Sequence, residues 1–299
     1  MDVRQLRYFV GIAESRSLTE ASRRLHIVQP ALSQRLGDLE KELGVQLVVR
    51  GRVGTALTPA GVELHENAKR ILKQIDYATA AVKEKAGVVE GVLTIGLLRS
   101  LSPVLSVRLF TELREAMPGV RPQIRVGYSA ELEAMLHQGA LDLATLVTEP
   151  GQGGGARTMA FSERLCLVGS SAMLAPVSRR PRLKHVVGMP LLLSPMQPAH
   201  RLVMEAAEQQ GLSLDVVGGI EDVASILELC EAGLGVTILT SFVAKRAAER
   251  RGMAVLPIAE RGLERHLRIA LQHDAHRSAA VLVGESILGR VLGDVLRRA

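Results

Sequence analysis

Hydrophobic residues near the start of the chain recur at the three- and four-residue intervals typical of amphipathic helices. A first helix is predicted after Asp2, with Gln5 three residues later as in a capping box, and a second after Ser17. A third begins at Gln29-Pro30, where proline suits the first helical turn, and ends at Gly44. Its inward face carries Leu32, Leu36, Leu39 and Leu43. The pattern predicts three short helices within 45 residues.

The turn between the second and third predicted helices is short, as in a helix-turn-helix unit. With its leucines inward, the third helix presents amide, hydroxyl and guanidinium groups on its first turns. These groups read base edges in a major groove, and the helix amino terminus attracts phosphate. The candidate base-contacting residues are Gln29, Pro30, Ser33, Gln34 and Arg35. A solvated face of an ordinary three-helix bundle remains the alternative.

A two-stranded wing is predicted directly after the third helix. Residues 46–49 and 55–57 are strand-like, and the turn between them carries Arg50 and Arg52. Arginines on a wing beside a recognition helix contact phosphate or the minor groove. Nine basic and six acidic residues among the first 58 supply half of the chain's net charge of +6. This excess is modest, so the placement of the arginines has to matter more than their number.

A long helix is predicted after Thr58-Pro59, and its apolar positions alternate at intervals of four and three residues. This alternation is a heptad seam, which favours pairing with a second helix, although only about three heptads are present. The seam consists of Leu64, Ala68, Ile71, Ile75, Ala78 and Val82. An amphipathic helix packed on its own domain is the alternative.

The remainder of the chain alternates strand-like and helix-like segments, which favours α/β units with doubly wound sheets. A hinge is predicted at residues 87–91. Ligands in such sheets bind beyond the carboxyl ends of strands, against helix amino termini. Arg99, Ser100 and Ser102 lie in the first such loop, and Ser129 lies in the second. Hydroxyls and a guanidinium beside helix amino termini predict a small anion, unless the serines only cap helices.

Composition narrows the class of protein. The 299 residues are 47% hydrophobic and 23% charged, which excludes a wholly disordered chain. Aromatic residues make up only 2%, so a binder that stacks single-stranded bases is not expected. The basic balance permits a polyanionic partner, although a GC-rich genome also enriches arginine. No segment has the length of a membrane span and the first residues lack a secretory signal pattern, so we expect a cytoplasmic protein.

The residues of the first 61 positions resemble the LysR-type transcriptional regulators, and those around 25–34 are most similar to the nitrogen-assimilation-control branch. The matching segments are residues 6–10, 17–19, 21, 25–26, 29–33, 39–40, 42–47, 50 and 57–61. Val28 departs from the pattern, since serine is usual there, and its loss removes a helix cap typically worth about 1 kcal/mol. Val48 also stands where the family usually has phenylalanine.

The resemblance implies a fold class: an all-α amino-terminal part followed by α/β structure. The expected order is a winged helix-turn-helix DNA-binding domain (1–58), a linker helix and hinge (59–90) and a two-lobed domain similar to periplasmic binding proteins (91–299). Lobe I would comprise 91–160 and 260–299, and lobe II would comprise 161–259. The family dimerises through the linker helix, which agrees with the seam. Pairing would place two recognition helices about 34 Å apart on an inverted repeat.

The resemblance also implies function. A dimer or tetramer would bind double-stranded DNA and contact RNA polymerase, and a small anionic effector in the cleft would modulate it. Gln197 and Thr237 match loop positions that face the family's cleft. Some members of the family respond to no small molecule, so a ligand-independent regulator or an architectural DNA protein is the alternative.

No cofactor, metal site or catalytic constellation is expected. The glycine-rich run at 151–155 lacks the lysine of a phosphate-binding loop, and His273, Asp274 and His276 lack further ligands. No nucleophile and base pair can be named, so an enzyme is not expected. Cys166 alternates with leucines in a predicted strand and has no evident resolving partner, which favours a packing role over a redox role.

Overall fold

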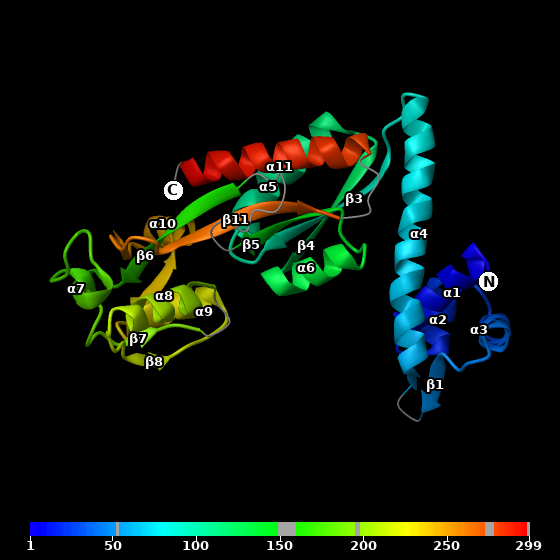
Figure 1. Ribbon diagram of the computed structural model, residues 1–299, viewed down its shortest axis with the longest axis horizontal. Helices are drawn as coiled ribbons and strands as arrows, with labels where there is room; N and C mark the ends of the chain where they lie inside the picture. The colour runs from blue at the N-terminus through cyan, green and yellow to red at the C-terminus, as the bar shows by residue number, and fades with distance from the viewer. Residues whose placement is uncertain (52–53, 149–159, 195–197, 273–277, 298–299) are drawn as a thin grey trace.

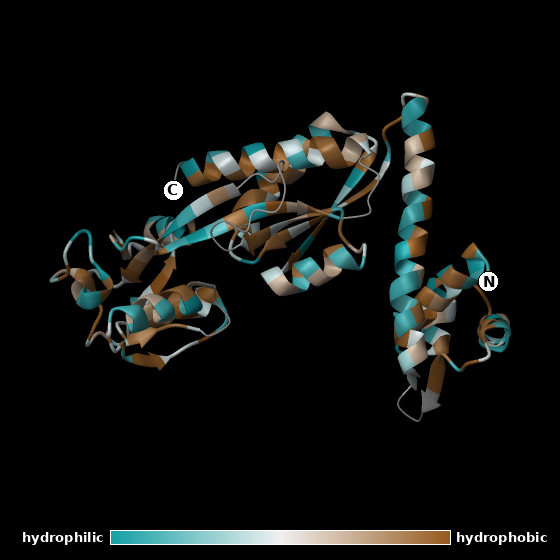
Figure 2. Cartoon of the chain, in the orientation of Figure 1, coloured by the Kyte–Doolittle hydropathy of each residue, from teal (hydrophilic) through white to brown (hydrophobic). Residues whose placement is uncertain are grey.

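The computed structural model describes residues 1–51, 54–148, 160–194, 198–272 and 278–297. Figure 1 shows three parts in sequence. The amino-terminal helices lie at one end of the long helix α4, and two α/β lobes follow from its other end. Figure 2 shows hydrophobic and hydrophilic positions interleaved along α4. No described helix is long and apolar enough to cross a membrane.

The amino-terminal part forms the three helices and the wing that the sequence predicts. Its elements are α1 (Val3–Ala13), α2 (Leu18–Arg24), α3 (Gln29–Leu43), β1 (Val48–Gly51) and β2 (Gly54–Leu57). Asp2 and Gln5 form the predicted capping box, and Ser17 accepts a hydrogen bond from the Glu20 amide. Helix α3 ends at Gly44, whose φ of 71° is the left-handed conformation that glycine adopts without strain.

One apolar core holds these helices together and includes Phe9, Ile12, Leu32 and Leu36. Two close approaches fix the wing to the helices. Thr55 N donates to Arg16 O at 3.1 Å, and a Cβ on Gly54 would lie 2.3 Å from that oxygen. Only glycine fits there, so the start of β2 is locked to the loop before α2.

Helix α4 (Pro59–Lys85) begins with the predicted cap, because the Thr58 hydroxyl accepts from Gly61 N at 3.0 Å. A Cβ on Gly61 would approach Leu47 O to 2.0 Å, so glycine lets α4 start directly against the wing. The helix runs for 27 residues and ends before Gly87, whose φ of 79° turns the chain into the sheet.

Lobe I is a sheet covered by helices on its two faces (Figure 1). Its elements are β3 (Gly91–Leu98), α5 (Ser102–Ala116), β4 (Val120–Gly127), α6 (Ser129–His137), β5 (Leu143–Thr148), β11 (Glu264–Leu271) and α11 (Ala279–Arg297). Strand β3 pairs in parallel with β4 and β5, while β11 pairs antiparallel with β5. Nearly continuous burial along β3 follows from the helices on its two faces.

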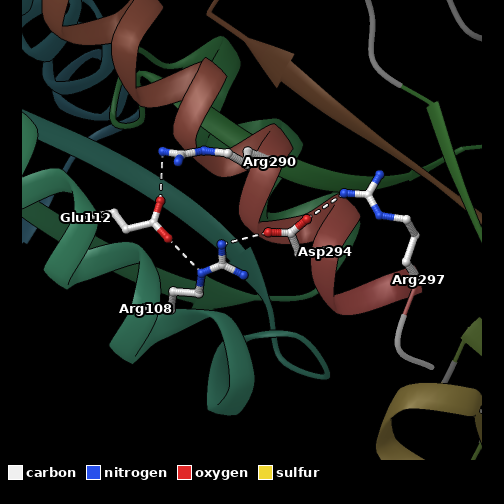
Figure 3. Close-up of polar contacts among 5 residues, drawn as sticks. All are labelled: Arg108, Glu112, Arg290, Asp294 and Arg297. Carbon is white, nitrogen blue, oxygen red and sulfur yellow. Dashed lines mark hydrogen bonds and ion pairs between the residues drawn. The ribbon is translucent and has the colours of Figure 1, made fainter.

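Helices α5 and α11 are also joined by the surface ion-pair network that Figure 3 shows. Arg108 contacts Glu112 on its own helix at 2.6 Å and Asp294 on α11 at 2.7 Å. Arg290 and Arg297 extend the network from α11. The network holds α5 by its middle turns, while its first turn faces the other lobe.

Lobe II alternates strands and helices, as the sequence predicts for this part of the chain. It also contains two short helices that the sequence did not predict, α7 and a 3-10 turn. Its elements are β6 (Ala160–Gly169), α7 (Ser171–Leu174), the 3-10 turn Leu183–His185, β7 (Leu191–Leu192), α8 (Pro198–Gln209), β8 (Val216–Gly218), α9 (Val223–Glu231), β9 (Thr237–Thr240), α10 (Ser241–Arg251) and β10 (Ala254–Pro257). Its apolar residues form two clusters separate from the core of lobe I.

Strand β6 belongs to both lobes. Residues 160–164 pair with β11, and residues 165–169 pair with β9 and β10. The partner therefore changes between Arg164 and Leu165, within one continuous strand. This strand and the start of β11 form the rigid connection between the lobes, and the cleft lies beside it.

Candidate nucleic-acid interface and effector cleft

The first turns of α3 present the side chains that the sequence predicted. Gln29, Pro30, Gln34 and Arg35 are exposed, while Ser33 is half-buried and has a polar partner in the fold. Val28, which is 71% exposed, stands at the N-cap position and makes no side-chain cap there. The first amide groups of α3 are therefore available to an anion such as a phosphate.

The wing is positioned by a residue of α3 that sequence reasoning missed. Glu40 Oε1 accepts hydrogen bonds from Leu47 N at 2.8 Å and Val48 N at 3.1 Å. These bonds tie the start of β1 to the carboxyl half of α3. Arg50 lies in β1 opposite Thr55, and Arg52 lies outside the described residues. The fold therefore places the backbone of the wing at a fixed position relative to the exposed face of α3.

The predicted seam of α4 divides into two parts. Leu64 packs against the core of the amino-terminal domain and Ala68 is fully buried within the chain, so the alternative of packing on its own domain holds there. Ile75 is half-buried and Ala78 is exposed. Ile71 and Val82 are 40% and 72% exposed, so this part of the apolar face is uncovered in a single chain.

The carboxyl half of α4 is docked on lobe I by a buried polar cluster around Asp142, the Asp142 cluster. The Tyr77 hydroxyl donates to Asp142 Oδ1 at 2.5 Å, and Lys73 Nζ lies 3.0 Å from the same oxygen. Thr94 N donates to Asp142 Oδ2 at 2.6 Å. Gln272 Oε1 lies 2.6 Å from the Tyr77 hydroxyl. No local sequence pattern indicates this cluster, because its members come from four distant segments.

The cluster keeps Tyr77 neutral. Burial is the main cause that raises the pKa of the Tyr77 hydroxyl far above its usual value, and the charge of Asp142 adds to it. A hydroxyl has one proton, so it cannot donate to Asp142 and Gln272 together. Turning the Gln272 amide over places an N–H against the Tyr77 oxygen and satisfies both contacts.

A cavity of about 560 Å³ lies between the lobes, beside β6 and β11. Lobe I contributes the carboxyl ends of β3 and β4 with the first turns of α5 and α6. Lobe II contributes the first turns of α9 and α10. The lining residues are Leu98–Ser100, Ser102–Val104, Val126–Ser129, Glu221–Ala224, Leu227, Phe242, Val243, Arg246, Ala247 and Arg265. This is the position that the rule for ligands in α/β sheets predicts.

Four of the six predicted effector residues line this cavity, namely Arg99, Ser100, Ser102 and Ser129. Thr237 is fully buried in β9 and does not line the cavity. Gln197 lies outside the described residues. The loops after β3 and β4 could be located from the sequence, since both directly precede predicted helices.

Arg265 is the main cleft residue that the sequence analysis missed. It is 2% exposed and pairs with the buried Glu163 across β11 and β6. Arg265 Nη1 donates to Ser100 Oγ at 2.9 Å, and Glu163 Oε1 accepts from Phe242 N at 3.1 Å. One buried pair therefore connects the first loop of lobe I to α10 of lobe II.

The charges around the cavity come from both lobes. Arg99 lies over the Tyr128 ring at 5.3 Å from the centroid. Asp222 caps α9, and its pKa is lowered chiefly by the hydrogen bond from Ser225 N, with Arg99 a smaller cause. Arg246 Nη1 donates to Pro103 O at 2.9 Å and so reaches from α10 to the first turn of α5.

The surroundings of the two cysteines are those of packed, unreactive thiols. Cys166 and Cys230 are both buried and both free. Burial raises the pKa of each thiol to about 11, so little reactive thiolate exists at neutral pH. The predicted packing role fits these surroundings. Among the described residues no group of three or more side chains could hold a metal ion, and His273, Asp274 and His276 lie outside them.

Comparison with known proteins agrees with this architecture. Residues 3–62 match the family model "Bacterial regulatory helix-turn-helix protein, lysR family", and residues 86–284 match "LysR substrate binding domain". The chain is 32% identical over 247 residues to the nitrogen assimilation regulatory protein nac of Klebsiella aerogenes, covering 82% of this chain and 80% of that protein.

Two solved structures are similar over nearly the full length. A peroxide-bound mutant of OxyR from Corynebacterium glutamicum is 26% identical with a TM-score of 0.62, covering 99% of this chain and 94% of that one. CbnR in complex with its target DNA is 21% identical with a TM-score of 0.68, covering 100% and 99%. At 21% identity, the similarity to CbnR shows a shared fold.

Proposed function

This chain belongs to the LysR family, so it is a LysR-type DNA-binding transcriptional regulator with an effector-binding domain, and we propose that the first turns of α3 read its DNA site. Gln29, Pro30, Ser33, Gln34 and Arg35 meet the major groove. Amide and hydroxyl side chains read adenine and other bases there, and arginine reads guanine through two parallel hydrogen bonds. Arg50 and Arg52 of the wing contact phosphate or the minor groove.

The single observation that carries this proposal is the exposed polar face of α3 at an uncapped amino terminus. The apolar side of the same helix is buried through Leu32, Leu36 and Leu39, so the polar side is the one available to a duplex. Glu40 fixes the wing beside it. A duplex therefore meets a preformed surface rather than a flexible segment.

The protein acts as a dimer or a tetramer on an inverted repeat. The uncovered apolar residues Ile71 and Val82 on α4 support pairing of two linker helices. Of the predicted set, the proposed seam keeps Ile71, Ile75, Ala78 and Val82, whereas Leu64 and Ala68 are covered within the chain itself. Such pairing sets two copies of α3 about 34 Å apart.

A small anion binds in the cleft and changes the geometry of the dimer, and through it the contact with DNA and RNA polymerase in the cytoplasm. Arg99, Ser100, Ser102 and Ser129 line the open cavity, which supports an effector over the ligand-independent alternative. Gln197 remains a proposed contributor, whereas Thr237, which is fully buried and does not line the cavity, is withdrawn. The proposed domains are 1–58, 59–90 and 91–299, with the lobes divided near 160 and 260. We propose no catalytic activity.

One experiment tests the DNA proposal. Purified full-length protein is mixed with random-sequence duplexes, and the retained fragments are sequenced. We expect an inverted repeat whose half-sites are about one helical turn apart. Fragments without any common motif, or a motif without two-fold symmetry, would contradict the proposed readout by paired α3 helices.

A further inference from the structure

Most of the exposed wall of the cleft is apolar. Beside eight serine or charged residues, its lining includes the aliphatic and aromatic side chains Val104, Val223, Leu227, Phe242 and Val243. Tyr128 adds a second ring in a chain that has only seven aromatic residues. Burying an apolar molecule against such walls is favourable in proportion to the apolar area covered. The cavity therefore selects a ligand with an apolar body.

The hydroxyl oxygens of the cleft already accept or share hydrogen bonds within the protein. Ser100 Oγ accepts from Arg265, and Ser129 Oγ accepts from Val147 N at 3.0 Å. Ser102 Oγ lies 3.2 Å from Ser106 Oγ. A polyol that donates to these oxygens has to compete with the donors of the protein. Ser100 and Ser129 each keep their own O–H, which can donate to an acceptor such as a carboxylate oxygen.

Positive charge is available at one end of the cavity. Arg246 is half-buried and donates to the neutral carbonyl of Pro103, and no described carboxylate lies within ion-pair distance of it. That bond uses one of five guanidinium donors. The adjacent amino terminus of α5 has no side-chain cap, but Pro103 lacks an N–H and the Val104 amide already donates to Leu101 O at 3.1 Å. The guanidinium is therefore the group that favours a planar anion at this place.

A second arginine, Arg265, is committed to the protein itself. It lines the cavity but is 2% exposed, and its Nη atoms are satisfied by Glu163 and Ser100. Its Nε has no hydrogen-bond partner among the described residues and is itself inaccessible to solvent, so a ligand in the cavity does not reach it. Arg246 is therefore better placed than Arg265 to bind a ligand.

Negative charge in the cavity wall limits the ligand to a single anionic group. Glu221 and Asp222 line the cavity from lobe II, as Arg246 does. A second carboxylate on the ligand would be repelled by these two groups. Arg99 lies over the Tyr128 ring, and its charge helps to lower the pKa of Asp222. We therefore take Arg246 as the main cationic contact.

We propose that the ligand of this cleft is a monocarboxylate with an apolar, ring-bearing or branched body, held by Arg246 at the first turn of α5. The proposal rests on the effector cleft of the proposed function and specifies its chemistry. Because Arg246 comes from lobe II and α5 from lobe I, the carboxylate binds both lobes at once. Its binding therefore stabilises one relative position of the lobes.

Calorimetry on the full-length protein tests this with chosen probes. 3-Phenylpropanoate is compared with its neutral amide, with succinate, with sulfate and with L-phenylalanine. We expect the monocarboxylate to bind with a Kd of about 1 mM or tighter and at least tenfold better than each of the others. Equal binding of the amide or of succinate, or tighter binding of L-phenylalanine, would overturn the assignment. So would a failure of 3-phenylpropanoate, 4-methylpentanoate and octanoate to bind at that concentration.

Two variants locate the site. Arg246→Gln is expected to weaken 3-phenylpropanoate binding about tenfold to a hundredfold, because a charge-assisted contact is lost. Arg261→Gln changes an exposed arginine outside the cavity, serves as the matched control and should bind normally. Ala224→Leu fills the cavity from an exposed position on α9 and should also weaken binding.

Thermal unfolding confirms that each variant is folded. Unchanged affinity in both Arg246→Gln and Ala224→Leu would place the ligand elsewhere. The DNA selection experiment is independent of these measurements. If an inverted repeat is recovered but no carboxylate binds, this inference is rejected and the DNA proposal stands. If the carboxylate binds but no inverted repeat is recovered, the DNA proposal is rejected and this inference stands.

Discussion

The docking of α4 on lobe I depends on the Tyr77 hydroxyl. The substitution Tyr77→Phe removes that hydroxyl and keeps the ring. Tyr77 is 6% exposed and Asp142 is 1% exposed, so their hydrogen bond is shielded from water. A hydrogen bond to a buried charged group contributes about 1.5–3 kcal/mol. Lys73 Nζ and Thr94 N still serve the carboxylate after the change. We therefore expect the lower end, about 1.5 kcal/mol of lost unfolding free energy.

For a folding unit of this size that loss lowers Tm by roughly 3–6 °C. Thermal unfolding of the full-length protein followed by circular dichroism measures it. Hydrogen exchange supplies a second readout, since the amides in the carboxyl half of α4 should exchange faster when the helix loses its contact with lobe I. Tyr8→Phe is the matched control, because Tyr8 is a half-buried tyrosine of the amino-terminal core, away from the Asp142 cluster.

The result that would refute the reasoning is specific. If Tyr77→Phe and Tyr8→Phe melt together and α4 exchanges at the wild-type rate, the Asp142 cluster does not hold the helix. A lower Tm with unchanged exchange in α4 would show that the hydroxyl stabilises lobe I alone.

Three further outcomes follow from the structure. Ser33→Ala or Gln34→Ala should weaken binding to the selected DNA site more than binding to random DNA. Arg50→Gln should weaken binding to both and make the affinity less dependent on salt concentration. Filter binding at several salt concentrations measures both effects. Equal loss on all sequences would remove Ser33 and Gln34 from base readout. Burial lowers the pKa of His65 in the folded protein. As pH falls below about 6.5, His65 therefore takes up a proton more readily in the unfolded chain, and the free energy of unfolding should decrease. His65→Gln should reduce that fall in melts between about pH 8 and pH 5.5. Arg108→Gln breaks the contact between α5 and α11, and its small destabilisation should shrink in high salt; an effect independent of salt would argue for packing instead.

Much of the architecture was readable from local patterns. Helix starts at Asp2, Ser17 and Thr58 follow from capping side chains, and the structure confirms each one. The elements of the lobes were predicted in order because their apolar periods are regular. The short helix α7 was missed, since four residues give no periodicity. The serine loops of the cleft were located because parallel strands bring their carboxyl ends to one edge of a sheet.

The pairings that make the sites work were not readable in this way. Glu163 and Arg265 are 102 positions apart, and Tyr77 and Asp142 are 65 apart. Nothing in their local sequence distinguishes them from other charged or aromatic residues. The seam of α4 shows the same limit, because its spacing is identical whether a position faces its own core, as Ala68 does, or lies exposed, as Val82 does.

The sequence by itself determined the helix-turn-helix, the exposed reading face of α3 and the order of the α/β elements. Capping, periodicity and turn chemistry act between neighbouring residues, so a linear pattern records them. Only the tertiary structure decided how α4 docks on lobe I, where the strands cross between lobes and which charges meet in the cleft. Those features arise when segments far apart in the chain are buried together, and the free energy of a buried charge depends on which partner the fold brings to it.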